Sequence, residues 1–122
     1  MKVYQIDHVQ IAMPAGKEAL ARDFYSGVLG IPEKEKPKKL AARGGAWFET
    51  ENLKVHLGVD KNFTPAKKAH IAFLTKNVGE IEKLCIENGY EVYSDQPLEG
   101  YTRIYVLDPF GNRLEFMEKL EI

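Results

Sequence analysis

The sequence predicts an α+β fold of two βαβββ modules whose mixed sheets form a partly closed barrel. Its 122 residues are a length typical of one domain. Two similar apolar segments, DHVQIA at 7–12 and AHIAFL at 69–74, each carry a histidine near the start. A stretch with helical spacing and three short apolar segments follow each of them. We therefore expect a single domain over 1–122, with module 1 at about 1–62 and module 2 at about 66–122.

The first module should begin with a strand over 3–13, VYQIDHVQIAM. Apolar residues then recur at the helical spacing i, i+4, i+8, at Leu20, Phe24 and Val28. The helix is expected to end near Gly30, because glycine accepts the left-handed conformation common after a helix. Short apolar segments bounded by turn residues predict three further strands, at 31–36, 46–50 and 53–59.

The second module should repeat this order, starting with a strand over 69–75. Asn77, followed three residues later by Glu80, resembles a capping box and predicts the start of a helix. This helix should close at Asn88 and Gly89. Three strands are expected after it, at 91–94, 102–107 and 113–118. The stretch DPFGN predicts the hairpin turn between the last two strands, because proline fixes one dihedral and Gly-Asn accepts positive φ.

The two modules can be aligned by counting, because duplicated units keep equivalent positions at equivalent separations. The separation is 22 residues from His8 to Gly30. It is 19 residues from His70 to Gly89, so the first module carries three extra residues around its helix. From the two glycines onward the counts agree through to the last strands.

Counting 26 residues on from each glycine reaches His56 in the first module and Glu115 in the second. Successive side chains alternate across a sheet, so His8 and Gln10 should lie opposite the apolar residues that pack on the helix. The same alternation places His56 and Glu115 opposite the apolar residues of their strands, whereas around His70 both faces are apolar. We expect the polar inner faces of the two sheets to form a cup lined by His8, His56, His70 and Glu115.

Neutral imidazoles with a carboxylate suit a divalent first-row metal such as zinc, nickel, manganese or iron. Two histidines and one carboxylate leave coordination positions open, as a catalytic site requires. The alternative is that each histidine is a hydrogen-bonded strand residue and that Glu115 pairs with Arg113 or Arg103. Because four possible ligands occupy repeat-equivalent positions, we favour the metal site.

Composition and charge exclude several classes of protein. The net charge of −1 and pI of about 6.3 imply no broad basic face for nucleic acid. A local lysine cluster is read as a solvated loop rather than an anion site; it comprises Lys34, Lys36, Lys38 and Lys39. No apolar run approaches a membrane span and no signal-like stretch opens the chain, so a cytoplasmic protein is expected. Cys85 is alone and lies on the apolar face of a predicted helix, which favours a buried, inert thiol.

Five segments together resemble the glyoxalase/bleomycin resistance protein/dioxygenase family, the vicinal oxygen chelate superfamily: DHVQIAM, FYSGVLGI, VHLGVD, AHIAFL and TRIYVLDPFGNRLEF. The likeness runs through essentially the whole chain. It implies the glyoxalase/bleomycin-resistance fold and metal ligands at His8, His70 and Glu115. His56 matches the fourth-strand position, which is a glutamate ligand and base in true glyoxalase I enzymes. His56 is therefore expected to be a fourth ligand or a general base, with His56 and Glu115 as the catalytic pair.

The resemblance implies a divalent-metal-dependent enzyme acting on a small molecule with vicinal oxygens, of the lyase, isomerase or thiol-transfer type in preference to a dioxygenase. The alternative is a metal-free, drug-sequestering binding protein of the bleomycin-resistance type; a regulatory module is a third possibility. The candidates to line the substrate pocket are Gln10, Trp47 or Phe48, Phe63, Tyr101, Arg103 and Tyr105, although an aromatic residue in a strand is more often core. The resemblance also implies a homodimer, because each module has only about 60 residues and modules of this family commonly pair across or within chains to build the cup; the sequence leaves both arrangements open. No nucleic-acid or membrane partner is expected.

Overall fold

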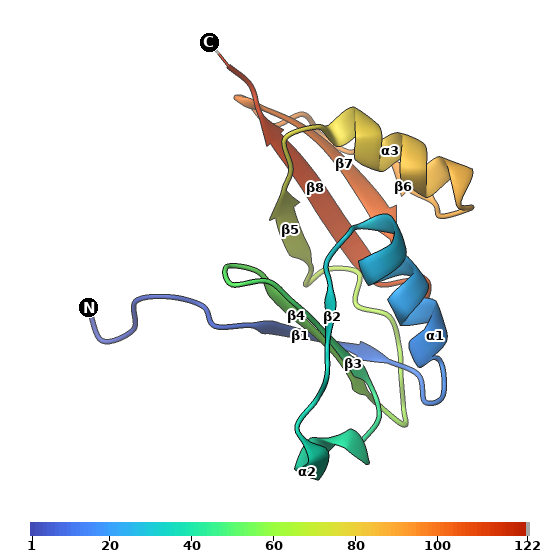
Figure 1. The fold of residues 1–122 in the computed structure, drawn as a ribbon. Coiled ribbons are helices and arrows are strands. Elements are labelled where there is room, and N and C mark those ends of the chain that lie inside the picture. The colour runs from blue at the N-terminus through green and yellow to red at the C-terminus, as the bar shows by residue number, and fades with distance from the viewer. Residues whose placement is uncertain (122) are drawn as a thin grey trace. The chain divides into compact units, whose positions relative to one another are not determined.

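The computed structural model describes residues 1–121. The chain divides into two units, Met1–Thr64 and Pro65–Ile122, and each is described by itself. Each unit contains one four-stranded mixed sheet (Figure 1). The predicted fold class, α+β with two βαβββ modules, is confirmed.

Unit 1 contains the following elements: β1 (Val9–Met13), α1 (Glu18–Ala21), the π-helix η1 (Arg22–Val28), β2 (Glu33–Lys34), α2 (Lys38–Ala41), β3 (Ala46–Glu49) and β4 (Lys54–Val59). The strand order is β1-β4-β3-β2. The pair β1–β4 is parallel and the other pairs are antiparallel. The short α2 was not predicted; it begins within the lysine cluster that the sequence indicated as a loop.

Unit 2 contains β5 (Ile71–Leu74), α3 (Val78–Glu87), β6 (Val92–Tyr93), β7 (Tyr101–Leu107) and β8 (Arg113–Lys119). The order β5-β8-β7-β6 repeats that of unit 1, again with a parallel first pair. Helix α3 lies across β6, β7 and β8 (Figure 1). Its N-cap is the predicted one, since Oδ1 of Asn77 accepts a hydrogen bond from the Glu80 N–H at 3.0 Å.

The strand register agrees with the repeat that the counting predicts. In unit 1, Gln10 of β1 lies beside His56 of β4. In unit 2, Ala72 of β5 lies beside Glu115 of β8. In both units the histidine of the repeated segment stands two residues before that neighbour. The same local geometry is therefore built twice.

The predicted strand over 3–13 forms only from Val9 onward. Its neighbour β4 begins at Lys54, so the earlier residues have no strand of unit 1 beside them. They extend away from β1 (Figure 1). Their apolar residues are exposed, at 78% for Val3, 89% for Tyr4 and 74% for Ile6. The alternating pattern is present, but strand formation also needs a hydrogen-bonding partner.

The first helix differs from the expected amphipathic α-helix. Leu20, predicted to be on its buried face, is 46% exposed, whereas Phe24 and Tyr25 are both fully buried. The cause is the π-helical stretch, in which the N–H of Leu29 reaches the carbonyl of Phe24 five residues back. This wider turn lets two consecutive aromatic residues pack inward, and Tyr25 stacks on Phe48 of β3 with ring centroids 5.5 Å apart.

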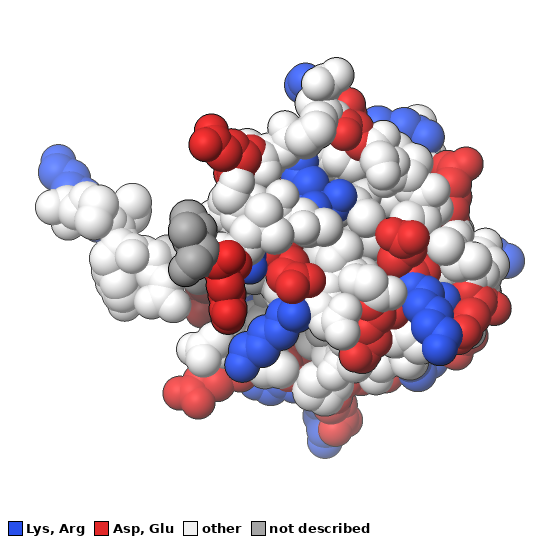
Figure 2. All heavy atoms as spheres, turned by 90° about the horizontal axis from the view of Figure 1, so that it is seen from above, with Lys and Arg blue, Asp and Glu red and all other residues white. Residues whose placement is uncertain are grey.

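Cys85 is fully buried on the inner face of α3, and this burial raises the pKa of its thiol to about 11. The prediction of a buried thiol is thus confirmed, and a pKa this high keeps it protonated and unreactive near neutral pH. Acidic and basic side chains are interspersed over the face shown in Figure 2, where the described residues form no broad basic surface. In the part of the chain described, no helix is both long and apolar enough to cross a membrane.

Candidate functional site

In unit 1 the imidazole of His56 lies between two other rings. Trp47 stands directly opposite His56 in the β3–β4 pair, and their rings stack with centroids 4.0 Å apart and planes at 4°. The His8 ring also stacks on His56, at 4.3 Å and 22°. Only 7% of the His56 side chain is exposed. Stacking on two rings restricts its orientation, so its nitrogens point in defined directions.

The strongest polar contact of His56 is with Glu49, a residue that the sequence reasoning missed. Nε2 of His56 lies 2.5 Å from Oε2 of Glu49, whose other oxygen is 3.4 Å from Nζ of Lys34. Burial acts to raise the pKa of Glu49, but the hydrogen bonds and charges of His56 and Lys34 outweigh it and hold the pKa below its usual value. Alternation in AWFE could have signalled the contact, because Trp47 and Glu49 share one face of β3.

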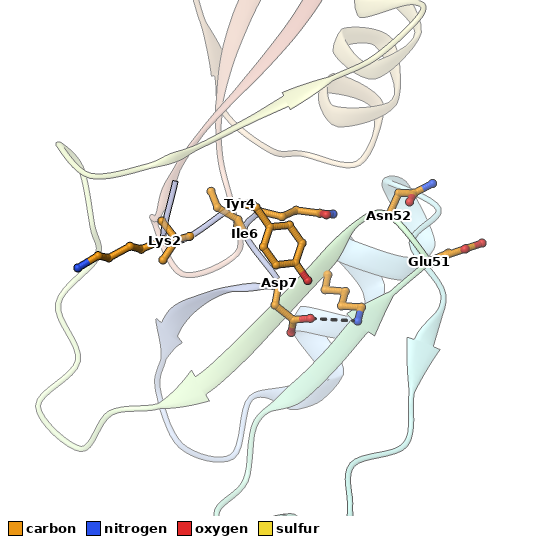
Figure 3. A pocket seen from close by; sticks show the side chains of 9 residues that line it. Lys2, Tyr4, Ile6, Asp7, Glu51 and Asn52 are labelled. Carbon is orange, nitrogen blue, oxygen red and sulfur yellow. Dashed lines mark hydrogen bonds and ion pairs between the residues drawn. The ribbon is translucent and has the colours of Figure 1, made fainter.

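His8 is held through its other ring nitrogen. Nδ1 of His8 donates to Oδ2 of Asp7 at 3.0 Å, and Oδ1 of Asp7 lies 3.4 Å from Nζ of Lys54. The dashed line from Asp7 in Figure 3 marks this contact with Lys54. Both residues line a hollow of about 350 Å³, together with the N-terminal segment and the turn after β3. The hydrogen bond from His8, followed by the charge of Lys54, lowers the pKa of Asp7. With Nδ1 engaged, Nε2 is the nitrogen of His8 that can bind a metal.

In unit 2 the pair His70 and Glu115 has a closely similar arrangement. Nδ1 of His70 donates to the backbone carbonyl of Lys68 at 2.9 Å, and Nε2 lies 2.8 Å from Oε1 of Glu115. Only 7% of the Glu115 side chain is exposed. With a proton on Nδ1, two electron-pair donors, Nε2 and Oε1, face each other. Such a contact requires a shared proton or a cation.

The second oxygen of Glu115 is occupied by Arg103. Nη1 of Arg103 lies 3.1 Å from Oε2 of Glu115, and the same guanidinium donates to the carbonyl of Gln96. Arg113, the other partner considered from the sequence, lies instead over the ring of Tyr105, 4.0 Å from its centroid. The carboxylate therefore contacts both a permanent cation and the imidazole of His70.

A model of the Glyoxalase/Bleomycin resistance protein/Dioxygenase superfamily matches residues 5–116. The chain belongs to this superfamily. A glyoxalase family protein from Bacillus anthracis is 47% identical, with 97% of each chain covered and a TM-score of 0.90. No protein with a curated description matches.

Two further crystal structures share the superfamily fold at low identity. The fosfomycin resistance protein FosX from Listeria monocytogenes, in its hexagonal form, is 16% identical, with a TM-score of 0.76 over 97% of this chain and 95% of that one. The antibiotic binding protein TnmS3 from Streptomyces sp. CB03234 is 18% identical, with a TM-score of 0.71 over 97% of this chain and 100% of that one. These likenesses show the fold alone.

Members of the superfamily often bind divalent metals, and the geometry here is compatible with one. All three histidines of the chain are candidate ligands. In His8 and His70 a hydrogen-bond acceptor holds Nδ1 and leaves Nε2 free to coordinate a metal, which is the usual arrangement around metal-bound histidine. The 2.8 Å between Nε2 and Oε1 is near the roughly 3.0 Å between neighbouring ligands placed about 2.1 Å from one octahedral ion.

Each unit provides one part of the predicted set. Unit 1 brings together His8 and His56, and unit 2 brings together His70 and Glu115. Neither unit by itself gathers three His, Cys, Asp or Glu side chains in a metal-binding group among its described residues. The four-residue site, which requires both pairs, stays a prediction.

The candidate substrate-lining residues differ in where the structure places them. Trp47 shares the His56 face of its sheet with Gln10, whereas Phe48 is fully buried against the helix side and belongs to the core. In unit 2 the ring of Tyr105 makes an edge contact with His70 at 5.9 Å. The remaining candidates are partly buried: Phe63, Tyr101 and Arg103. Of Trp47 and Phe48, only Trp47 lies on the face of the sheet that carries His56; its place in a substrate pocket stays a prediction.

Proposed function

We propose that this protein is a divalent-metal-dependent enzyme acting on a small molecule with vicinal oxygens, of the lyase, isomerase or thiol-transfer type. His8, His70 and Glu115 would hold the metal. The observation that carries the proposal is the contact of His70 with the buried carboxylate of Glu115, whose Oε1 faces Nε2 of His70 at 2.8 Å. A divalent ion bound there would stabilise negative charge developing on substrate oxygens.

With Nε2 held by Glu49, His56 would act through Nδ1, and we propose that it acts there as a general base rather than as a fourth ligand. Ligation through Nε2 would require this nitrogen to leave a 2.5 Å contact with a buried carboxylate. If Nε2–H donates to Glu49, Nδ1 carries the free electron pair and can accept a proton. Glu49 then fixes the tautomer and orientation of the ring, as carboxylates do for catalytic histidines.

Competition with a chelator at fixed pH tests both the metal site and the role of His56. The proteins to compare are the wild type and the variants His56→Ala, His70→Ala and Glu51→Ala, the last an exposed residue as control. We expect His70→Ala to lose metal affinity clearly, because it removes a ligand, and His56→Ala to keep nearly all of it. Equal losses in His56→Ala and His70→Ala would show that His56 is a ligand.

The second candidate function is a metal-free small-molecule binding protein. It is favoured by the observation that the buried side chains are already paired, Glu115 with His70 and Arg103, and His56 with Glu49. Elemental analysis of untagged protein after reconstitution with zinc, nickel, manganese or ferrous iron separates the two candidates. Less than about one-tenth of an equivalent of every metal would exclude the enzyme proposal, since a site with three metal-ligating side chains should retain a bound ion.

We further propose a homodimer, which is supported by the exposed N-terminal segment. Its alternating apolar residues extend directly from β1, an edge strand of the unit 1 sheet. An extended apolar segment that continues an edge strand can pair with another chain. The cytoplasmic location stays a prediction.

A further inference from the structure

A small hollow of about 240 Å³ opens on the same face of the unit 1 sheet as His56. Gln10 and Trp47, the two strand neighbours of His56 in β1 and β3, form part of its wall. The segment between β2 and β3, which includes α2, supplies Lys36 and Arg43. At roughly 30 Å³ for each water, the hollow has room for about eight, which is enough for a charged group with a few carbon atoms.

The lining carries two positive charges and, among the described residues that form it, no carboxylate. Lys36 donates to the carbonyl of Gly44, and its ammonium has two further N–H donors. Neither Lys36 nor Arg43 forms an ion pair with a described residue. Because Lys36 is half-buried, an anion in the hollow would interact with it more strongly than with a fully solvated lysine.

The neutral part of the wall also provides a hydrogen-bond donor, the side-chain amide of Gln10. The Gln10 side chain lies flat across Gly58, where an added Cβ would stand only 2.7 Å from Nε2 of Gln10. Gly58 thus lets the amide extend over the sheet, and Trp47 lines the same hollow. An amide, an ammonium and a guanidinium together offer several N–H donors, the groups that bind an oxyanion.

We propose that this hollow binds the oxyanion group, a carboxylate or a phosphate-type group, of the ligand whose reacting part lies at His56. The proposal rests on the proposed function only in placing the substrate on this face, and it requires no metal. It also revises the interpretation of the lysine cluster as wholly solvated. Lys36 belongs to the anion site, together with Arg43, which is seven residues further along the chain.

Trp47 is the only tryptophan of the chain, so its fluorescence reports directly on this hollow. Protein treated with a chelator would be titrated with propionate and with methylphosphonate at constant ionic strength, using propionamide as the uncharged control of matched shape. We expect saturable changes with at least one of the anions and none with propionamide. The anion that binds more tightly indicates whether the hollow prefers a carboxylate or a phosphate-type group.

Two double variants separate specific binding from general electrostatics. Lys36→Met/Arg43→Met should weaken anion binding about tenfold or more, equivalent to about 1.4 kcal/mol. Lys38→Met/Lys39→Met removes the same charge from α2 outside the hollow and should leave binding nearly unchanged. Arg43→Met alone keeps the Lys36–Gly44 hydrogen bond, so it controls for misfolding of the segment in the double variant. It should weaken anion binding by a smaller factor.

Equal losses in the two double variants, binding of propionamide as strong as that of propionate, or no saturable response to either anion would each overturn the proposal. Loss of metal binding with anion binding intact would instead refute the enzyme function and leave the anion site supported. The two proposals therefore fail separately.

Discussion

Replacing Glu49 by glutamine tests whether the buried contact with His56 stabilises unit 1. The substitution keeps the size of the side chain but removes its charge. Only 8% of the Glu49 side chain is exposed, and it contacts both His56 at 2.5 Å and Lys34 at 3.4 Å. Hydrogen bonds to charged groups contribute about 1.5–3 kcal/mol, so we expect a loss of that size at pH 7. With an m-value of about 2 kcal/mol/M, the urea midpoint should fall by roughly 1 M.

The effect should depend on pH in a defined direction. The pKa of Glu49 is held below its ordinary value of 4.5, so its charged form stabilises the fold above about pH 4.5, and this contribution is lost as the pH falls through the lowered pKa. The difference between wild type and Glu49→Gln should therefore shrink in acid. Urea unfolding followed by Trp47 fluorescence measures it, with Glu51→Gln, an exposed residue of the adjacent turn, as the control. An equal loss in Glu51→Gln, or a difference that persists unchanged in acid, would refute the reasoning.

Two further predictions concern the N-terminal segment and a strained glycine. Ile6→Asp should weaken the proposed dimer in sedimentation velocity, because it places a charge in the exposed apolar segment. Ile86→Asp, at a residue 59% exposed on α3, should leave the dimer unchanged. A dimer unaffected by Ile6→Asp would argue against this interface. Gly45→Ala should lose more unfolding free energy than Gly89→Ala, by about 1–3 kcal/mol in urea titrations. Both glycines have positive φ, +83° and +82°, but only at Gly45 would a Cβ meet backbone, 2.1 Å from the Leu57 carbonyl oxygen, so equal losses would contradict the predicted clash.

Much of the fold and part of the site could be predicted from the sequence, because the signals involved are local. The helix cap at Asn77 requires only a side chain and an N–H three residues away. The DPFGN turn is closed by Asp108 and by Gly111 at positive φ. The repeat is a matter of counting, and it selected His56 and Glu115 as equivalent positions before any strand register was known. Periodicity and turn chemistry act over a few residues, which is why these predictions could be made without the structure.

Contacts between distant segments were decided only by the tertiary structure. Alternation shows which face a residue occupies, but not which side chain reaches across that face, so the approach of Glu49 to His56 was missed. The position of Trp47 on the His56 face, and of Phe48 in the core, depended on which face of β3 packs against η1. The gathering of Lys36 and Arg43 depended on the path of the segment around α2.

The incomplete first strand illustrates the same limit. The alternation over residues 3–13 indicates a segment that can form a strand. However, β4 begins at Lys54 and provides a neighbouring strand only from Val9 onward. A strand is completed by hydrogen bonds to another strand, and those partners lie far away in sequence. The sequence by itself therefore determined which segments can form strands and which residues are candidate metal ligands. The tertiary structure decided which of these partners meet, because cross-strand contacts depend on a register that no short stretch of sequence contains.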